Sequence, residues 1–214
     1  GGGAIACEFA QFFARFGVQV TLIQRSKHIL KEFDAAAATE IEKVFRREGI
    51  HVFTGTKLLD ARRKGKLKTV SFEQNGKKLY ASAEEILFAL GSVPNTASLN
   101  LENAGVQTEN GRVITNAGMQ TSAPHIFAAG DCTGSHEIVH IAIQQGETAV
   151  HNIIGGASVL ASRIIASMSN GSRGRSPHRM DYRLLISVVF TDPQVAFVGL
   201  TEKAATARGI KFLA

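Results

Sequence analysis

Apolar residues at the start of the chain recur with the period of a helix. They occupy positions Ile5, Phe9, Phe12, Phe13 and Phe16. This i, i+3/i+4, i+7 stripe predicts a helix over residues 4–16 with one buried face. Gly17 follows where a helix favours a left-handed residue at its C-terminal end.

The next ninety residues alternate between strand and helix patterns. The predicted elements are a buried strand at 18–23, a helix at 35–48, a short strand at 50–53 and a buried strand at 86–90. Between them, the alternating segments 67–72 and 77–80 flank Asn75-Gly76, which predicts a hairpin because both turn residues accept positive φ. The order indicates an α/β nucleotide-binding unit, Rossmann-like, with a β-meander.

The second half of the chain begins with an irregular stretch after Pro94. The elements predicted after it are a strand at 126–129 that ends in Gly130-Asp131, a helix at 137–154, a linker at 155–183, a strand at 184–190 and a helix at 201–208. Thr201 caps the last helix only in part, because Ala204 stands where a capping box has Glu or Gln.

Composition narrows the class of protein. With 214 residues, 44% hydrophobic and 20% charged, the chain is globular and long enough for one or two domains. Its apolar runs are broken before the roughly 18 residues that a membrane span needs, so we expect no membrane partner. Cys7 and Cys132 form no CxxC or metal-ligand spacing, which favours packing roles and a reducing cytoplasm.

The net charge of +6 raises the question of a polyanionic partner. The basic residues are scattered, apart from a cluster at Arg173, Arg175, His178 and Arg179, and aromatic residues are not interleaved with them. We therefore expect no nucleic acid, and interpret the charge as a solvated basic face together with an anionic cofactor.

Gly1-x-Gly3-x-x-Ala6 stands at the start of the first helix. The first glycine permits a tight turn, the second lets a pyrophosphate approach the backbone, and the small third residue lets the helix pack on its sheet. Since the helix and the next strand follow in the right order, the pattern predicts dinucleotide binding. The strand before Gly1 would then be missing, so we expect a chain truncated at its start.

The end of the predicted strand 18–23 bears on the choice of dinucleotide. Gln24 stands where an NAD site usually has the acid for the ribose 2′-hydroxyl. Arg25, Lys27 and Lys31 follow, and Arg25 is suited to clamp a 2′-phosphate. The pattern predicts NADP(H) rather than NAD(H), with a solvated basic loop as the alternative.

Four segments together carry a family resemblance. They are GGGAIACEFA at 1–10, ILFALGSVPNT at 86–96, IFAAGDCT at 126–133 and VFTDPQVAFVGLTEKAA at 189–205. In this order they resemble the pyridine nucleotide–disulfide oxidoreductases of the dihydrolipoamide dehydrogenase, glutathione reductase and mercuric reductase type. The resemblance covers nearly the whole chain.

The resemblance implies a domain organisation. The implied parts are an NAD(P)-binding domain at 1–91 lacking its first strand, a returning part of an FAD-binding domain at 92–155, a linker at 156–183 and the start of an α+β dimerisation domain at 184–214. We therefore expect a piece of a longer protein, truncated at both ends, whose full-length form is a homodimer with FAD.

The resemblance also assigns residues. Asp131, after Gly130, matches the aspartate that binds the ribityl chain of FAD, with a turn aspartate as the alternative. Glu8 matches a glutamate beside the nicotinamide, or is simply an exposed helix residue. The other implied cofactor contacts are Gly91 and Ala142, while Leu90 and Ser92 depart from the family pattern. His136 and His140 lack a third ligand, so no metal is expected.

The implied activity is hydride transfer from NAD(P)H through flavin to a disulfide or metal-ion acceptor, with a small-molecule substrate. The family's redox-active Cys-x4-Cys and its His…Glu pair do not occur in this sequence, so we expect the chain by itself to be inactive. Two alternatives remain open: a flavoprotein without redox cysteines that reduces a quinone or oxygen, and a noncatalytic dinucleotide-binding module.

Overall fold

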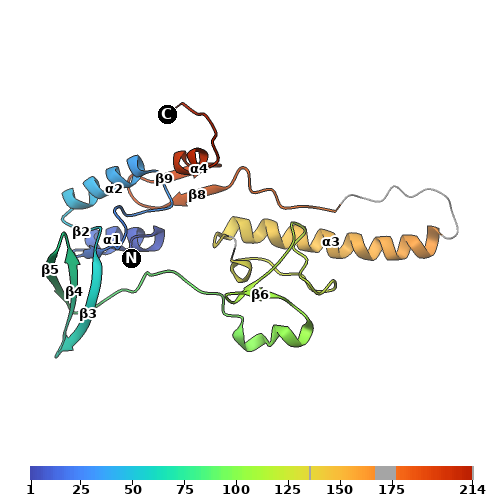
Figure 1. The fold of residues 1–214 in the computed structure, drawn as a ribbon, viewed down its shortest axis with the longest axis horizontal. Coiled ribbons are helices and arrows are strands. Elements are labelled where there is room, and N and C mark those ends of the chain that lie inside the picture. Colours follow the sequence, from blue (N-terminus) through green and yellow to red (C-terminus); the bar gives the residue numbers. More distant parts are fainter. Residues whose placement is uncertain (135, 167–176, 214) are drawn as a thin grey trace. The chain divides into compact units, whose positions relative to one another are not determined.

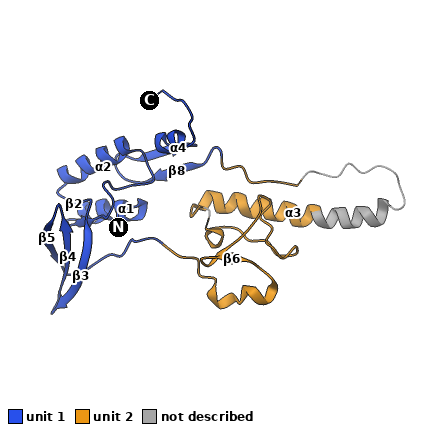
Figure 2. Cartoon of the chain, in the orientation of Figure 1, with its two compact units in different colours: residues 1–91, 183–214 blue, residues 92–182 orange. Residues whose placement is uncertain are grey.

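The computed structural model describes residues 1–134, 136–166 and 177–213. The chain forms two compact units (Figures 1 and 2). Unit 1 combines residues 1–91 with residues 183–214, and unit 2 comprises residues 92–182. The two ends of the sequence therefore fold together.

Unit 1 begins with a small α/β layer. Its elements are α1 (Ala4–Arg15), β1 (Thr21–Ile23), α2 (Ala35–Arg47) and β2 (His51–Phe53). β1 and β2 pair in parallel, with Leu22 opposite Val52. The predicted helices and strands of this region are confirmed, although β1 is shorter than the run 18–23.

The buried face of α1 is not the one that the sequence pattern predicts. The five residues of the apolar stripe are all exposed, from 37% at Phe13 to 75% at Phe16, and the aromatic rings among them contact one another. The helix instead buries its small residues Ala6, Cys7 and Ala10. Small side chains let the helix axis approach the core closely, so the described part of the sheet packs on this face.

The core of unit 1 joins both ends of the sequence. It consists of Cys7, Ala10, Leu22, Ile29, Leu30, Ala38, Ile41, Phe45, Ile50, Val189 and Val195. The last two belong to a hairpin of β8 (Ile186–Val189) and β9 (Val195–Val198), which α4 (Glu202–Ala207) follows. Thr201 Oγ1 accepts a hydrogen bond from Ala204 N, so the partial cap predicted for this helix is present.

The β-meander predicted after the strand at 50–53 is confirmed. It is the antiparallel sheet β3 (Lys57–Lys64), β4 (Leu67–Gln74) and β5 (Lys77–Ala83). Asn75 and Gly76 join β4 to β5 with φ values of 51° and 74°. These angles are those of the two-residue turn that Asn-Gly favours.

Two predicted buried strands are wrong. Residues 86–90 form no strand, and Leu87, Phe88 and Leu90 are exposed. Residues 126–129 contribute only an isolated bridge between Phe127 and Gln120. A strand forms only where its backbone pairs with a neighbouring strand. No described segment pairs with either of these two runs over more than one residue pair.

Unit 2 is dominated by a long helix. Its elements are η1 (Ala97–Leu99), η2 (Leu101–Ala104), β6 (Thr108–Glu109), β7 (Arg112–Val113), η3 (Asp131–Thr133) and α3 (Val139–Ala166). α3 confirms the helix predicted from residue 137 and extends to Ala166, into the range predicted as a linker. Residues 167–176 of that linker, with two arginines of the basic cluster, lie outside the described residues.

Candidate functional site

The glycine-rich turn leaves an open, positively polarised helix end. Gly3 is the N-cap of α1 and accepts a hydrogen bond from Cys7 N at 3.0 Å. A Cβ added to Gly3 would meet no atom within 4 Å, and no side chain caps the helix there. The first N–H groups of a helix and its dipole attract anions, so this end has the character of a phosphate site.

The other two members of the fingerprint have packing roles in this structure. A Cβ on Gly1 would lie 1.9 Å from the carbonyl oxygen of Ala89, so only glycine fits at that position. Ala6 is 8% exposed and lies on the buried face of α1. Gly1 and Ala6 therefore fix the turn against its surroundings, while Gly3 faces open space.

Gly2 is a site residue that the sequence pattern missed. A Cβ there would approach Gln24 Cδ and Cγ to 3.0 Å, so the glutamine side chain fills the space that the glycine leaves. The carbonyl of Gly2 accepts a hydrogen bond from Leu30 N at 2.6 Å. The fingerprint spacing treats this position as variable, and its need for glycine appears only through the tertiary contact with Gln24.

Gln24 lies at the end of β1 and is 9% exposed. Its Oε1 accepts the backbone N–H of Arg25 at 3.1 Å. Its backbone carbonyl accepts hydrogen bonds from both N and Oγ1 of Thr56. Among the residues that the structure describes, none accepts a hydrogen bond from Gln24 Nε2.

The loop after Gln24 is held in a fixed conformation. Ile29 N donates to Oε1 of the buried Glu42 at 3.1 Å, and His28 Nδ1 lies 3.3 Å from the same oxygen. Leu30 has a φ of 47° although it is not glycine, and it is 1% exposed. A backbone of this kind is strained, so the contacts around Leu30 must hold the loop against the glycine turn.

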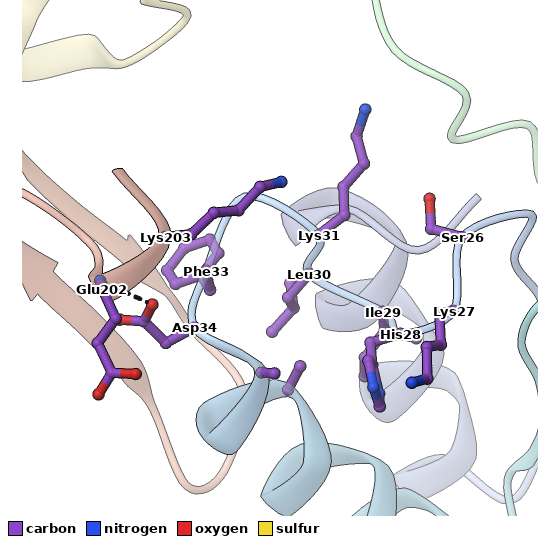
Figure 3. A pocket seen from close by; sticks show the side chains of 12 residues that line it. Ser26, Lys27, His28, Ile29, Leu30, Lys31, Phe33, Asp34, Glu202 and Lys203 are labelled. Carbon is purple, nitrogen blue, oxygen red and sulfur yellow. Dashed lines mark hydrogen bonds between the residues drawn. The ribbon is translucent and has the colours of Figure 1, made fainter. Parts of the chain in front are cut away.

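The three predicted phosphate-binding cations are not gathered at one point. Arg25 is exposed, and its guanidinium has no partner among the described residues. Lys27 and Lys31 line a separate cavity of about 430 Å³, and their ammonium groups point apart (Figure 3). Lys31 also lies 3.3 Å from the carboxylate of Glu32. Arg25 does not line this cavity. It follows directly after Gln24, whose side chain packs against Gly2.

Glu8 faces the segment that returns from the C-terminal part of the chain. Its Oε1 accepts a hydrogen bond from Phe190 N at 2.9 Å. One turn further along α1, the buried Gln11 exchanges two hydrogen bonds with the backbone of Asp192, at 2.7 and 2.8 Å. α1 therefore uses one face to dock the loop between β8 and β9.

Gly130 and Asp131 lie in unit 2, where Asp131 is the first residue of η3 and Gly130 stands directly before it. Gly130 has a φ of 83° and donates its N–H to Oε1 of the fully buried Gln145 at 2.6 Å. A Cβ on Gly130 would lie 3.5 Å from that of Ala142, so the backbone before η3 packs closely against α3. Asp131 is exposed, and no described residue donates to its carboxylate.

The remaining candidates have simpler environments. Burial, above all, raises the pKa of the Cys7 thiol to about 12, which keeps it protonated and unreactive. Gly91 has a φ of 106°, a conformation that favours glycine. Within 1–134, 136–166 and 177–213, no three His, Cys, Asp or Glu side chains are grouped as metal ligands.

Comparisons with a family profile, with related proteins and with solved structures all indicate the same family. The profile of the family described as pyridine nucleotide-disulphide oxidoreductase matches residues 1–146. Mercuric reductase from Staphylococcus aureus is 36% identical over 210 residues, which are 98% of this chain and 35% of that protein. Dihydrolipoyl dehydrogenase from Bacillus subtilis is 32% identical over 211 residues, which are 98% of this chain and 40% of that protein.

Solved structures agree. LpdA from Mycobacterium tuberculosis matches with a TM-score of 0.77 and 28% identity, over 96% of this chain and 40% of that one. The Cu(II) complex of the HOCl-induced flavoprotein disulfide reductase RclA from Escherichia coli matches with a TM-score of 0.74 and 27% identity, over 99% and 44%. The chain thus spans about two fifths of the length of these relatives. No described helix has the length and apolar character to cross a membrane.

Proposed function

The chain belongs to the pyridine nucleotide-disulphide oxidoreductase family, and from this membership we propose that unit 1 binds the pyridine nucleotide of an FAD-dependent oxidoreductase. The observation that carries the proposal is the open end of α1 at Gly3. Nothing in the described structure fills the space in front of it. The approach that a pyrophosphate needs is available there.

Different residues of unit 1 bind different parts of the dinucleotide. The N–H groups at the start of α1 donate to the pyrophosphate, and the helix dipole favours its charge. Gln24 and Arg25 lie at the end of β1, where the adenosine ribose of a dinucleotide sits in this fold. Because the Arg25 guanidinium is unpaired in the described structure, we propose that it binds a 2′-phosphate and that NADP(H) is preferred over NAD(H).

Unit 2 supplies residues that suit the flavin. The carboxylate of Asp131, which has no donor among the described residues, accepts hydroxyl donors of the ribityl chain. Gly130 and Ala142 keep the backbone beside it compact. When bound, FAD supplies the chemistry of accepting a hydride and passing the electrons on. We propose Glu8 as a nicotinamide-side residue, because a carboxylate accepts several hydrogen bonds and can hold Phe190 N at Oε1 while it binds a further donor.

For the full-length protein we propose a cytoplasmic homodimer that reduces a disulfide or a metal ion. Support comes from the relatives, among which are mercuric reductases and dihydrolipoyl dehydrogenases. A flavoprotein that reduces a quinone or oxygen is the alternative, and a noncatalytic module is another. A Cys-x4-Cys motif in the full-length sequence would distinguish the first activity from both.

Substitution of Gly3 tests the proposed binding mode. Gly3→Ala should leave the fold intact, because its Cβ meets no atom within 4 Å. It should weaken binding of NADPH about tenfold or more, since the methyl group occupies the path of the pyrophosphate; tenfold corresponds to about 1.4 kcal/mol. Calorimetric titration of the chain with NADPH and with NADH measures the effect.

The matched control is Gly146→Ala, the same change at a glycine on α3 where an added Cβ would also meet no atom within 4 Å. It should leave the dissociation constants as they are. Equal affinity of Gly3→Ala and the wild type would show that the pyrophosphate lies elsewhere. A wild-type chain that binds neither nucleotide would refute the proposed function.

A further inference from the structure

We infer that the sheet of β3, β4 and β5 is an interaction surface for an acidic, extended segment of a partner protein, which adds to the sheet as a further strand along β3. This sheet, called the basic sheet below, is separate from the glycine-rich turn at α1 and from the end of β1. The inference is therefore independent of the proposed function. Its charge, its open edge and its exposed leucines each favour this kind of partner.

The excess of positive charge in the chain lies in the basic sheet. Residues 57–83 contain eight lysines and arginines against two acidic residues, a net charge of +6, which equals the net charge of all 214 residues. The rest of the chain is neutral as a whole, so the excess charge is not spread over the surface. A concentrated charge attracts a partner of the opposite sign and repels a second copy of itself.

The cations are densest around the turn that joins β3 to β4, where five of them lie between positions 62 and 68. Two of the five have acidic partners, since Arg62 pairs with Asp60 and Lys68 with Glu85. The other three are exposed and form no ion pair within the part of the chain that the structure describes; they are Arg63, Lys64 and Lys66. These three charges are available to a partner.

The basic sheet is fixed to the α/β layer at the end away from this turn. The ring of Phe72 packs against that of Phe53 in β2, with the centroids 5.1 Å apart. Gln74 Nε2 donates to the carbonyl of Thr54 at 2.6 Å. The turn after Lys64 lies at the opposite end of β4, away from the α/β layer (Figure 1). The contacts that hold the sheet therefore leave the basic turn open.

β3 is an edge strand that offers its backbone to a partner. In the described structure it pairs with β4 alone, and all eight of its residues are exposed. The register shifts between Leu58 and Asp60, and the pairing with β4 is regular from Asp60 to Lys64. The outer N–H and C=O groups of a regular edge can pair with a further strand. A peptide supplies the matching groups, whereas a nucleic acid or a lipid headgroup does not.

Exposed leucines lie between the cations. Leu58, Leu59 and Leu67 are 54%, 43% and 49% exposed. Lysines on an edge strand discourage its pairing with like strands, but leucines beside them do not serve that purpose. An acidic peptide with aliphatic side chains covers the leucines and pairs with the cations at once. The basic sheet therefore fits such a peptide better than it fits a polyanion that offers charge alone.

A fluorescein-labelled octapeptide of alternating Glu and Val tests the inference, with its binding to the chain followed by fluorescence anisotropy. The wild type should bind it saturably. Combining Arg63→Glu, Lys64→Glu and Lys66→Glu should weaken binding about tenfold or more, because like charges then face each other. All three side chains are exposed, so the fold should persist. The matched control combines Lys203→Glu, Arg208→Glu and Lys211→Glu, exposed positions around α4, and should change the dissociation constant much less.

A second peptide separates strand addition from simple charge attraction. With every other peptide nitrogen methylated it keeps its charge but loses donors, and it should bind about fivefold or more weakly, since main-chain hydrogen bonds supply the affinity of strand addition. Equal affinity for both peptides would overturn the inference, as would the absence of saturable binding or an equal loss in the α4 control. Tighter binding of a labelled single-stranded DNA of the same charge would identify a nucleic-acid surface instead.

Discussion

At the scale of single residues, the site depends on contacts that sequence spacing does not encode. The spacing of Gly1, Gly3 and Ala6 predicts a phosphate turn, and the open space at Gly3 agrees with that use. The spacing gives no reason for Gly2 or for the positive φ of Leu30. Both follow from the way the loop after Gln24 returns to the turn, which is a tertiary contact between residues far apart in the chain.

Arg25 provides the first prediction at this scale. Arg25→Ala in the full-length enzyme should raise the Michaelis constant for NADPH and leave that for NADH nearly unchanged, because only the former has a 2′-phosphate. One charge-assisted contact contributes about 1.5–3 kcal/mol, or roughly ten- to hundredfold. Steady-state kinetics with both nucleotides measures it.

Lys31→Ala is the matched control for Arg25. Lys31 lies 3.3 Å from Glu32, lines the separate cavity and points away from Lys27, so a much smaller change is expected. A wild-type enzyme that uses NADH at least as efficiently as NADPH would identify the basic run as a solvated loop.

Asp131 provides a second prediction. Asp131→Ala in the full-length enzyme should lower FAD retention tenfold or more, because each charge-assisted hydrogen bond to a ribityl hydroxyl contributes about 1.5–3 kcal/mol. The fold of η3 should persist, since Gly134 N donates to the Asp131 carbonyl and not to its side chain. Flavin absorbance after gel filtration measures retention, with the exposed Glu109→Ala as control. Unchanged retention would identify Asp131 as a turn residue.

At the scale of elements, periodicity predicts α1 but not the face that it buries. The 3.6-residue pattern is strong in the phenylalanine stripe, yet Ala6, Cys7 and Ala10 face the core. Which face packs depends on the neighbouring strands, which the pattern does not contain. In the same way, the apolar residues 86–90 are typical of a strand, but they form none because their backbone does not pair with a described neighbouring strand. The Asn75-Gly76 hairpin was predictable because its signal is local.

An ion-pair network fixes the β8–β9 loop to α1 and leads to a pH prediction. Arg15 Nη2 lies 2.7 Å from Glu48 and 2.8 Å from Asp192. The hydrogen bond from Arg15 lowers the pKa of Glu48 below its ordinary value of 4.5. A depressed carboxyl pKa stabilises the fold above the unfolded pKa, and this stability is lost as the pH falls through the folded pKa.

The free energy of unfolding should therefore fall below about pH 4.5, and fall less steeply in Glu48→Gln than in the wild type. Denaturant titrations at neutral pH and across the acid range measure the difference. The control is Glu40→Gln, whose exposed i,i+3 pair with Lys43 contributes little. Parallel acid curves for the wild type and Glu48→Gln would contradict the account.

At the scale of the whole molecule, the order of the four sequence motifs indicated the protein family, which the predicted helices and strands alone did not. Four motifs in the right order indicate the family, and the family profile and the relatives confirm it. The same sequence did not predict that residues 183–214 share a core with residues 1–91. That association rests on Val189, Val195 and the side chains of α1, and no local pattern signals it.

The most direct test of the central claim is a titration of the isotope-labelled chain with NADPH, followed by NMR chemical shifts of the backbone amides. Binding of the pyrophosphate at the start of α1 should give saturable shifts concentrated at Gly2, Gly3 and Arg25, and smaller shifts with NADH. The absence of saturable shifts at these three amides, or shifts confined to the lysine-lined cavity around Lys31 and Lys203, would contradict this binding mode.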